Sequence, residues 1–300
     1  MTPDFATLLA AAKDRPFAFI VGWPVEHSRS PLIHGYWLQE RGINGHYGRL
    51  AVAPGGEALR ATIDFIRRTP HARGCNLTLP HKIDVLGMLD HIEPKAAHIG
   101  AVNTVVKRAD GTLEGRNTDA FGFIAALRAG APSWKPEAAP AVVLGAGGAA
   151  RAVCHALVDA GVPELRLLNR TRQTAIDLGA QVTPKDGRTV VIDNWDRRDA
   201  ALGGAGLLVN TTSLGMKGLP PLELDLAALP GSAVVDDIVY VLPLETPLLA
   251  AARARGNATV DGLDMLLHQA RPGFAAWFGV AMPEVTPALR RAAAGDLGAR

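Results

Sequence analysis

The chain has 300 residues, of which 48% are hydrophobic and 20% charged, and its formal net charge is +2. This length predicts two domains, each large enough for its own core. The near-neutral charge argues against nucleic acid or an anionic membrane surface as a partner, and no apolar run approaches the ~18 residues of a membrane-spanning helix. The N-terminus lacks the basic cluster of a signal peptide, and the two cysteines, Cys75 and Cys154, fit a reducing compartment. We therefore expect a cytoplasmic protein that handles small molecules.

Apolar strand-like runs alternate with helical patterns along nearly the whole chain, which predicts an α/β fold. In the first half, strands are expected at 17–21, 48–52, 74–79 and 101–106, and helices at 31–41, 58–68 and 120–129. Residues 130–140 contain three prolines, so we expect a surface connection without regular structure there. In the second half, strands are expected at 141–144, 165–168, 189–192, 207–209 and 233–235. Repeated strand–helix units of this kind are typical of a doubly wound, Rossmann-like sheet.

After Gly262 the pattern changes to two helices, near residues 263–270 and 287–294. A nucleotide-binding sheet does not need this helix pair, so we expect it to return to the first domain. The expected domains are 1–118 plus 262–300 for the substrate and 119–261 for a dinucleotide. A small-molecule substrate is the expected partner, with no nucleic acid and no membrane, and the chain is expected to act as a monomer or a homodimer.

A glycine-rich turn separates the strand expected at 141–144 from a helical run that begins at Arg151. The turn consists of Gly145, Ala146, Gly147, Gly148, Ala149 and Ala150. A strand, Gly-x-Gly-x-x-Ala and a helix, in this order, predict a dinucleotide-binding site. The first glycine permits a tight turn, the second lets the backbone approach a pyrophosphate, and the start of the helix binds the anion.

The second strand of this half ends in Asn169, Arg170, Thr171 and Arg172. NAD-binding versions of the fold carry an acidic residue about 20 residues after the first glycine. That acid is absent here. A carboxylate would repel a 2′-phosphate, whereas a guanidinium binds it through paired donors. The segment predicts NADP rather than NAD, and the alternative is that Arg170 and Arg172 are solvated charges at a helix start.

Four polar clusters stand at the ends of apolar runs in the first half, at residues 27–31, 75–82, 100–104 and 115–119. Because ligands bind outside the carboxyl ends of the strands in an open parallel sheet, we expect these clusters to converge on one pocket. Dehydrogenation of an alcohol needs a group that takes or gives the hydroxyl proton while hydride moves. Lys82 beside a carboxylate such as Asp119 would supply it.

Each of these residues also has an ordinary structural interpretation. Ser30 before Pro31 is a good helix N-cap, Lys82 could be solvated, Asn103 could satisfy backbone groups at a strand end, and Asp119 could be a helix N-terminal acid. There is no Gly-x-Ser-x-Gly and no zinc-ligand spacing, so neither a hydrolase nor a metal site is expected. The set of clusters, rather than any one residue, favours a dehydrogenase.

The chain resembles the shikimate dehydrogenase family over essentially its full length. The matching segments lie at residues 22–31, 76–82, 100–104, 115–119, 145–149, 169–171, 210–216 and 262–270. Many segments in the right order make this match far more specific than any one motif. The resemblance implies reduction of 3-dehydroshikimate to shikimate with NADPH in chorismate and aromatic amino-acid biosynthesis.

The resemblance also implies roles for individual residues. The substrate-binding residues would be Ser28, Arg29, Ser30, Thr78, Asn103, Asp119, Tyr240 and Gln269, with Ser28, Ser30 and Tyr240 on the carboxylate and Thr78, Asn103 and Gln269 on ring hydroxyls. Lys82 and Asp119 would form the catalytic pair. Gly145 to Ala149 would hold the pyrophosphate, Asn169 to Arg172 the 2′-phosphate, and Ile238 and Gly262 the nicotinamide side. Arg29 could add charge near the carboxylate or point to solvent.

The chain departs from the family pattern at Thr174, where relatives often have a second arginine; Arg172 is its candidate replacement. Two other functions are compatible with parts of this pattern. A quinate/shikimate dehydrogenase of broader cofactor use tends to carry an acid at the position of Asn169, which counts against it. A non-catalytic ligand sensor predicts loss of Lys82 or Asp119, and both are present.

Overall fold

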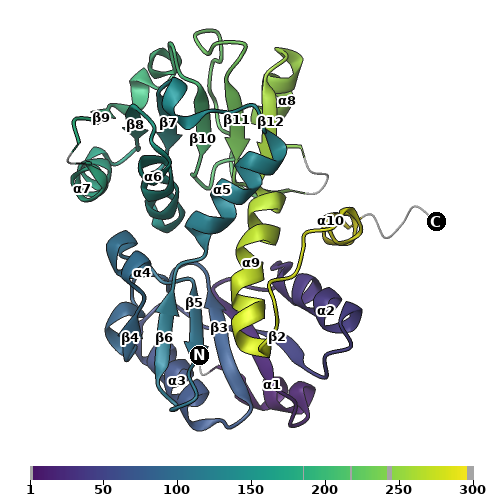
Figure 1. The fold of residues 1–300 in the computed structure, drawn as a ribbon. Helices are drawn as coiled ribbons and strands as arrows, with labels where there is room; N and C mark the ends of the chain where they lie inside the picture. The colour runs from purple at the N-terminus through teal and green to yellow at the C-terminus, as the bar shows by residue number, and fades with distance from the viewer. Residues whose placement is uncertain (1–2, 185, 217, 242–244, 296–300) are drawn as a thin grey trace. The chain divides into compact units, whose positions relative to one another are not determined.

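The computed structural model describes residues 3–184, 186–216, 218–241 and 245–295. They form two compact units: residues 1–118 with 269–300, and residues 119–268. Each unit has its own six-stranded sheet (Figure 1). The α/β expectation is confirmed, and the second unit has the Rossmann-like sheet that the sequence predicts.

The first unit contains strands β1 to β6 and the helices that connect and follow them. The strands are β1 (Phe17–Gly22), β2 (His46–Ala51), β3 (Ala72–Leu77), β4 (His91–Ile92), β5 (Thr104–Lys107) and β6 (Leu113–Arg116). The helices are α1 (Phe5–Ala12), α2 (Ser30–Glu40), α3 (Gly56–Arg68), α4 (Pro94–Ile99) and α10 (Pro287–Ala294), with a 3-10 turn at Leu86–Met88. The sheet order is β2-β1-β3-β5-β6-β4.

This first sheet is mixed, which corrects the expectation of a parallel one. β1 runs parallel to β2 and β3, whereas β5 runs antiparallel to both β3 and β6. The buried side chains of α3, Leu59, Ile63 and Ile66, recur at helical spacing and pack in one core with strand residues such as Phe19. The helix therefore covers one face of the sheet and leaves the strand ends available for polar groups.

The second unit contains strands β7 to β12 in an all-parallel sheet. The strands are β7 (Ala141–Leu144), β8 (Glu164–Leu168), β9 (Thr189–Asp193), β10 (Leu207–Asn210), β11 (Val234–Asp237) and β12 (Ala258–Asp261). The helices are α5 (Asp119–Gly130), α6 (Gly148–Ala160), α7 (Arg172–Val182) and α8 (Pro247–Ala254), with 3-10 turns at Pro136–Ala138, Trp195–Arg197 and Ala200–Leu202. The turn at Pro136–Ala138 corrects the expectation that residues 130–140 hold no regular element.

The strand order of the second sheet is β12-β11-β10-β7-β8-β9. The chain moves outward from β7 through β8 to β9 and then returns to β10 on the other side of β7. The carboxyl ends of β7 and β10 therefore form the topological switch point, where ligands bind in open parallel sheets. All four residues of β7 are fully buried, which explains why this strand is a continuous apolar run.

Helix α9 (Gly262–Phe278) carries the chain from the second unit back to the first. Its C-terminal half belongs to the first unit, where the Trp277 indole donates to the Val105 carbonyl at 2.9 Å. The following segment packs on α2, since the Trp37 indole donates to the Glu284 carbonyl.

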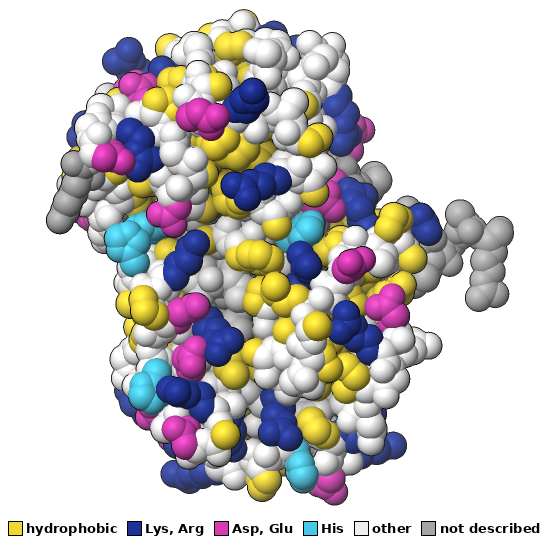
Figure 2. All heavy atoms as spheres, in the orientation of Figure 1, with side chains coloured by type: hydrophobic (Ala, Val, Ile, Leu, Met, Phe, Trp, Pro, Cys, Tyr) yellow, Lys and Arg dark blue, Asp and Glu magenta, His cyan; other side chains and the backbone are white. Residues whose placement is uncertain are grey.

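Charged side chains of both signs are interspersed on the face that Figure 2 shows, without a continuous patch of one sign on either unit. Among the described residues, no helix has the length and apolar character needed to span a membrane. No group of three or more metal-ligating side chains gathers in the described part of the chain either.

Candidate active site

The four polar clusters of the first unit meet at one edge of its sheet. Gly22, Leu77 and Arg116 end strands β1, β3 and β6 at this edge, and Thr104 begins the antiparallel β5 there. The Asn103 carbonyl accepts from Leu77 N–H at 2.8 Å, and Asn103 N–H donates to the Arg116 carbonyl at 3.1 Å. The strand ends next to the clusters therefore lie on the same side of the sheet, and one cluster precedes its strand because β5 runs antiparallel to its neighbours. That the clusters line one pocket stays a prediction.

Asn103 is the centre of a buried network of amides and hydroxyls. Its Oδ1 accepts from the Thr118 N–H at 2.8 Å, and its Nδ2 donates to Thr118 Oγ1 at 2.9 Å and to Gln269 Oε1 at 3.2 Å. Asn103 is 2% exposed and Gln269 8%. Two residues 166 positions apart, both predicted to bind substrate hydroxyls, are thus brought together by hydrogen bonds.

Two further residues of this network, Asn76 and Tyr47, are absent from the set expected from the sequence. The Tyr47 hydroxyl donates to Asn76 Oδ1 at 2.6 Å, and Asn76 Nδ2 donates to the Asn103 carbonyl and to Thr104 Oγ1. Burial raises the pKa of the Tyr47 phenol well above its ordinary value, an effect that a hydrogen bond with Ser30 partly offsets. No local motif marks Tyr47, because its role depends on a tertiary contact with β3.

Lys82 lies in the turn that follows β3 and is half-buried. Its backbone carbonyl accepts from Val102 N–H at 2.8 Å, next to Asn103. Thr78, in the same turn, donates its N–H to the Val21 carbonyl at 2.9 Å. A Cβ on Gly22 would lie 2.3 Å from the Thr78 methyl, so glycine at the end of β1 makes room for this threonine. Thr78 and Lys82 are both held at the edge where Asn103 lies.

The segment between β1 and α2, residues 23–29, begins at the same strand ends and carries Ser28 and Arg29. Helix α2 begins at Ser30, with Arg29 in the preceding cap position, and the cap makes no side-chain hydrogen bond. Ser30 is therefore not the helix N-cap that its place before Pro31 suggests. The Ser28 hydroxyl accepts from Ser30 N–H at 3.2 Å, and the Arg49 guanidinium donates to the Glu26 carbonyl at 2.6 Å. Ser30 is buried, whereas Ser28 and Arg29 are half-exposed.

Asp119 and Tyr240 belong to the second unit. Asp119 is the first residue of α5 and is 5% exposed. It directly follows Thr118, whose backbone and hydroxyl are bonded to Asn103. Tyr240 comes three residues after β11 and is half-buried. Both the helix-terminal and the catalytic interpretations of Asp119 are compatible with its place in the fold.

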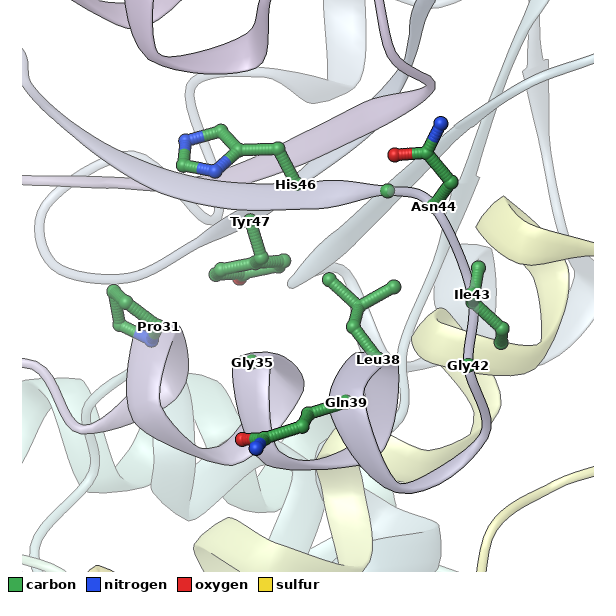
Figure 3. Close-up of a pocket in the computed structure, with 10 residues that line it drawn as sticks. Pro31, Gly35, Leu38, Gln39, Gly42, Ile43, Asn44, His46 and Tyr47 are labelled. Atoms are coloured by element: carbon green, nitrogen blue, oxygen red, sulfur yellow. The ribbon is translucent and has the colours of Figure 1, made fainter.

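A hollow of about 520 Å³ lies between α2 and β2 in the first unit (Figure 3). Leu38, Pro31 and Tyr47 point into the space between the helix and the strand. None of the predicted site residues lines it. Tyr47, which lines the hollow, also bonds Asn76 of the network through its hydroxyl.

In the second unit, the glycine-rich turn has the geometry that a pyrophosphate needs. Gly145 has φ +104°, and a Cβ there would lie 2.7 Å from Thr211 Oγ1, so only glycine fits. Gly147 is the cap residue of α6, makes no side-chain cap bond, and has no heavy atom within 4 Å of where its Cβ would be. The open space beside the N–H groups at the start of α6 suits a phosphate group.

The predicted 2′-phosphate residues follow β8. Asn169 Nδ2 donates to the Thr171 carbonyl at 2.9 Å, which fixes the turn before α7. Arg170 and Arg172 are exposed, and neither guanidinium makes a hydrogen bond or ion pair with any described residue. Two uncompensated guanidinium groups near the start of a helix fit an anionic ligand.

The opposite wall of the switch point follows β10 and β11. Thr211 Oγ1 donates to the Leu144 carbonyl at 2.7 Å, and Ile238 N–H donates to the Asn210 carbonyl at 3.1 Å. A Cβ on Gly262 would lie 2.1 Å from the Ile238 carbonyl oxygen, so Gly262 and Ile238 are in direct contact. The sequence assigns no individual site role within residues 210–216, although Asn210 and Thr211 hold this wall.

Two adjacent aspartates are buried at the end of β11. Asp237 accepts hydrogen bonds from Asn210 Nδ2, Val239 N–H and Thr246 Oγ1, at 2.9, 3.2 and 2.6 Å. Asp236 Oδ1 has no hydrogen-bond partner among the described residues. Burial raises the pKa of both carboxyls, and the nearby charge of Asp237 raises the pKa of Asp236 further.

Residues 20–105 match the model of the shikimate dehydrogenase substrate-binding domain. A shikimate dehydrogenase (NADP(+)) of Paramagnetospirillum magneticum is 58% identical over 273 residues, which cover 91% of this chain and 96% of that protein. The chain belongs to the shikimate dehydrogenase family.

Two solved structures extend the comparison to the fold. Shikimate 5-dehydrogenase from Thermus thermophilus, in complex with NADP(H) and shikimate, has a TM-score of 0.79 and 38% identity, covering 93% of this chain and 98% of that one. Quinate dehydrogenase from Corynebacterium glutamicum, in complex with NAD, has a TM-score of 0.84 and 32% identity, covering 93% and 98%. The two-unit architecture is thus shared with enzymes of differing cofactor and substrate.

Proposed function

We infer that the protein is an NADP-dependent shikimate dehydrogenase, an oxidoreductase that interconverts 3-dehydroshikimate and shikimate. The structural observation that supports this function is the hydrogen bond between Asn103 and Gln269, in a network next to the turn that carries Lys82. The chain is also 58% identical to a shikimate dehydrogenase (NADP(+)). Asn103 and Gln269 come from distant segments, and a binding site for a polyhydroxylated ring accounts for their meeting.

The substrate roles are proposed as follows. Ser28 and Ser30, together with Arg29 and Tyr240, would bind the carboxylate. Thr78, Asn103 and Gln269 would bind the ring hydroxyls. Neutral donors and acceptors suit hydroxyl groups, which both donate and accept hydrogen bonds. When a substrate hydroxyl takes the place of one partner in a hydrogen bond of the network, it can bond to the group left behind, so no buried group stays unpaired.

Lys82 and Asp119 are the proposed catalytic pair. Lys82 would donate a proton to the carbonyl oxygen during reduction and accept it back from the hydroxyl during oxidation. Asp119 would orient the ammonium group. Bound NADPH would supply the hydride that the chain itself cannot.

The residues of the second unit that would hold NADP are Gly145, Ala146, Gly147, Gly148 and Ala149 at the pyrophosphate, Asn169, Arg170, Thr171 and Arg172 at the 2′-phosphate, and Ile238 and Gly262 beside the nicotinamide. Residues 119–261 would form this domain, and residues 1–118 with 262–300 the substrate domain. In NAD-binding versions of this fold, the second strand ends in an acidic residue that bonds the ribose. Here that position is Asn169, followed by Arg170 and Arg172, and this supports NADP.

A quinate/shikimate dehydrogenase is the second candidate, favoured by the similarity to a quinate dehydrogenase in complex with NAD. Four assays on one preparation distinguish the two: reduction of NADP⁺ and of NAD⁺, each with shikimate and with quinate. Activity confined to shikimate with NADP⁺ is expected. Strong quinate oxidation with NAD⁺ would move the protein to the broader class. NADP binding without turnover would support a ligand sensor.

The proposed location is the cytoplasm, where aromatic biosynthesis would occur. Cys75 and Cys154 are unpaired and buried, as suits a reducing compartment. A monomer or homodimer is proposed, and analytical ultracentrifugation with and without NADP⁺ tests it.

A further inference from the structure

His81, the residue before Lys82, is fully buried and bonded to the backbone of another strand end. Its Nε2 lies 2.8 Å from the Val52 carbonyl oxygen. Because a carbonyl only accepts, Nε2 carries a ring hydrogen and donates it to Val52. Val52 directly follows β2, and its own N–H donates to the carbonyl of Gly22 at the end of β1. One imidazole thus ties the Lys82 turn to two neighbouring strand ends.

The backbone on either side of this ring is also fixed. His81 N–H donates to the Thr78 carbonyl at 3.0 Å, and the Lys82 carbonyl accepts from Val102 N–H at 2.8 Å. A lysine side chain is a long flexible stem, so the position of its ammonium group depends on how firmly its backbone is held. His81 anchors that backbone on the β2 side, opposite to Val102.

Packing alone does not explain an imidazole at this position. Nδ1 is buried with no hydrogen-bond partner in the described part of the chain. A polar ring with half of its hydrogen-bonding capacity unmet is less favourable in a core than an apolar ring of similar size. The bond to Val52 is what the imidazole adds over phenylalanine.

We propose that His81 is a positioning residue for Lys82, whose Nε2–H bond to the Val52 carbonyl fixes the turn from which Lys82 exchanges a proton with the substrate. This rests on the proposed function, in which Lys82 is the acid/base. His81 itself would not touch the reacting atoms. Its contribution is the placement of the lysine.

The test compares His81→Phe, which keeps the ring volume and loses the donor, with His81→Gln, whose amide N–H can reach the same carbonyl. We expect His81→Phe to lower kcat by about 10- to 100-fold, the range for a displacement of about 1 Å, with an unchanged KM for NADP⁺. The solvent isotope effect on kcat should rise because proton transfer becomes slower. His81→Gln should restore most of kcat and return the isotope effect toward the wild-type value.

Ile63→Val is the matched control, since Ile63 is buried in the core of the same unit and lies outside the proposed site. It should lower Tm and leave kcat and the isotope effect unchanged. Wild-type kcat in a folded His81→Phe variant would overturn the proposal, as would an Nδ1–H tautomer of His81 in ¹⁵N NMR of the wild-type protein. Absence of shikimate oxidation by the wild type would instead refute the proposed function, and the NMR result would still report on the bond.

Discussion

The two units of the chain prepare for a ligand in different ways. In the first unit, neutral side chains such as Asn103, Thr118 and Gln269 bond to one another at the strand ends. In the second unit, the turn after β7 presents bare backbone at Gly147, and two buried aspartates end β11. Side-chain recognition requires an interior whose donors and acceptors are matched, whereas backbone recognition requires empty space and correct φ angles. The following substitutions test this division.

Lys82→Ala should have the largest effect on activity. Loss of a general acid/base lowers kcat by roughly 10²–10⁴-fold, and Tm should change little because Lys82 is half-buried. Lys107→Ala is the control at the other edge of the sheet, where Lys107 Nζ donates to three carbonyls at the end of α3. It should lower Tm and preserve kcat. Near-normal turnover in Lys82→Ala would remove Lys82 from the mechanism.

Gly145→Ala should destabilise the second unit. Its φ of +104° and the 2.7 Å approach of a new Cβ to Thr211 Oγ1 combine backbone strain with overpacking. We expect a loss of about 2–5 kcal/mol in the free energy of unfolding. Gly147→Ala has space for its methyl and an extended backbone, so it should keep Tm and weaken NADP⁺ binding. Equal Tm losses in the two variants, measured by thermal melting, would contradict the separation of fold and ligand roles.

Arg170→Ala should raise KM for NADP⁺ by about 10- to 100-fold, since a hydrogen bond to a charged group contributes about 1.5–3 kcal/mol. KM for NAD⁺ should be nearly unchanged. Arg253→Ala, which removes an exposed guanidinium paired with Glu245, is the control and should change neither. Similar increases for both cofactors would show that Arg170 does not recognise the 2′-phosphate.

His34→Phe should change how the free energy of unfolding depends on pH in the acidic range. His34 is fully buried beside Tyr47, with ring centroids 3.9 Å apart, and burial lowers its pKa to about 3 from the ordinary 6.5. The unfolded chain therefore binds a proton that the folded protein excludes, and stability falls as pH drops from 6.5 toward 3. Urea midpoints at about pH 7 and about pH 4.5 should differ less in His34→Phe than in wild type. An unchanged difference would mean that His34 is protonated in the fold.

Asp236→Asn should have the smallest effect on stability. Unlike the effect of His34→Phe, it should appear at high rather than low pH. Burial raises the pKa of Asp236 above its unfolded value. The carboxyl therefore stabilises the fold most below the unfolded pKa, and this contribution is lost as pH rises through the folded pKa. The variant should have a higher Tm than wild type at alkaline pH, with the gap closing on acidification. Asp237→Asn is the control and should lower Tm, because Asp237 accepts three hydrogen bonds.

The same division explains what the sequence predicts well. Strand β7 and the glycine-rich turn are contiguous, so local periodicity and spacing predict the bounds of the strand and the turn that leads into α6. The Tyr47–Asn76–Asn103 chain joins three segments, and no spacing rule connects them. The expected strand at 101–106 begins too early because Ala101 and Val102 are buried in a loop. The sequence pattern misses strands β6 and β12 because they are short and contain charged residues.

The split of the first unit between residues 1–118 and 269–300 has a consequence during synthesis. When Thr118 leaves the ribosome, Asn103 Nδ2 still lacks Gln269, and the Val105 carbonyl lacks Trp277. Translation of the 150 residues of the second unit takes roughly 8–30 s at about 5–20 residues per second. Throughout that interval the nascent first unit exposes half-paired polar groups and uncovered apolar surface. The nucleotide-binding unit can therefore finish folding first, and the substrate-binding unit closes only when the last helices emerge.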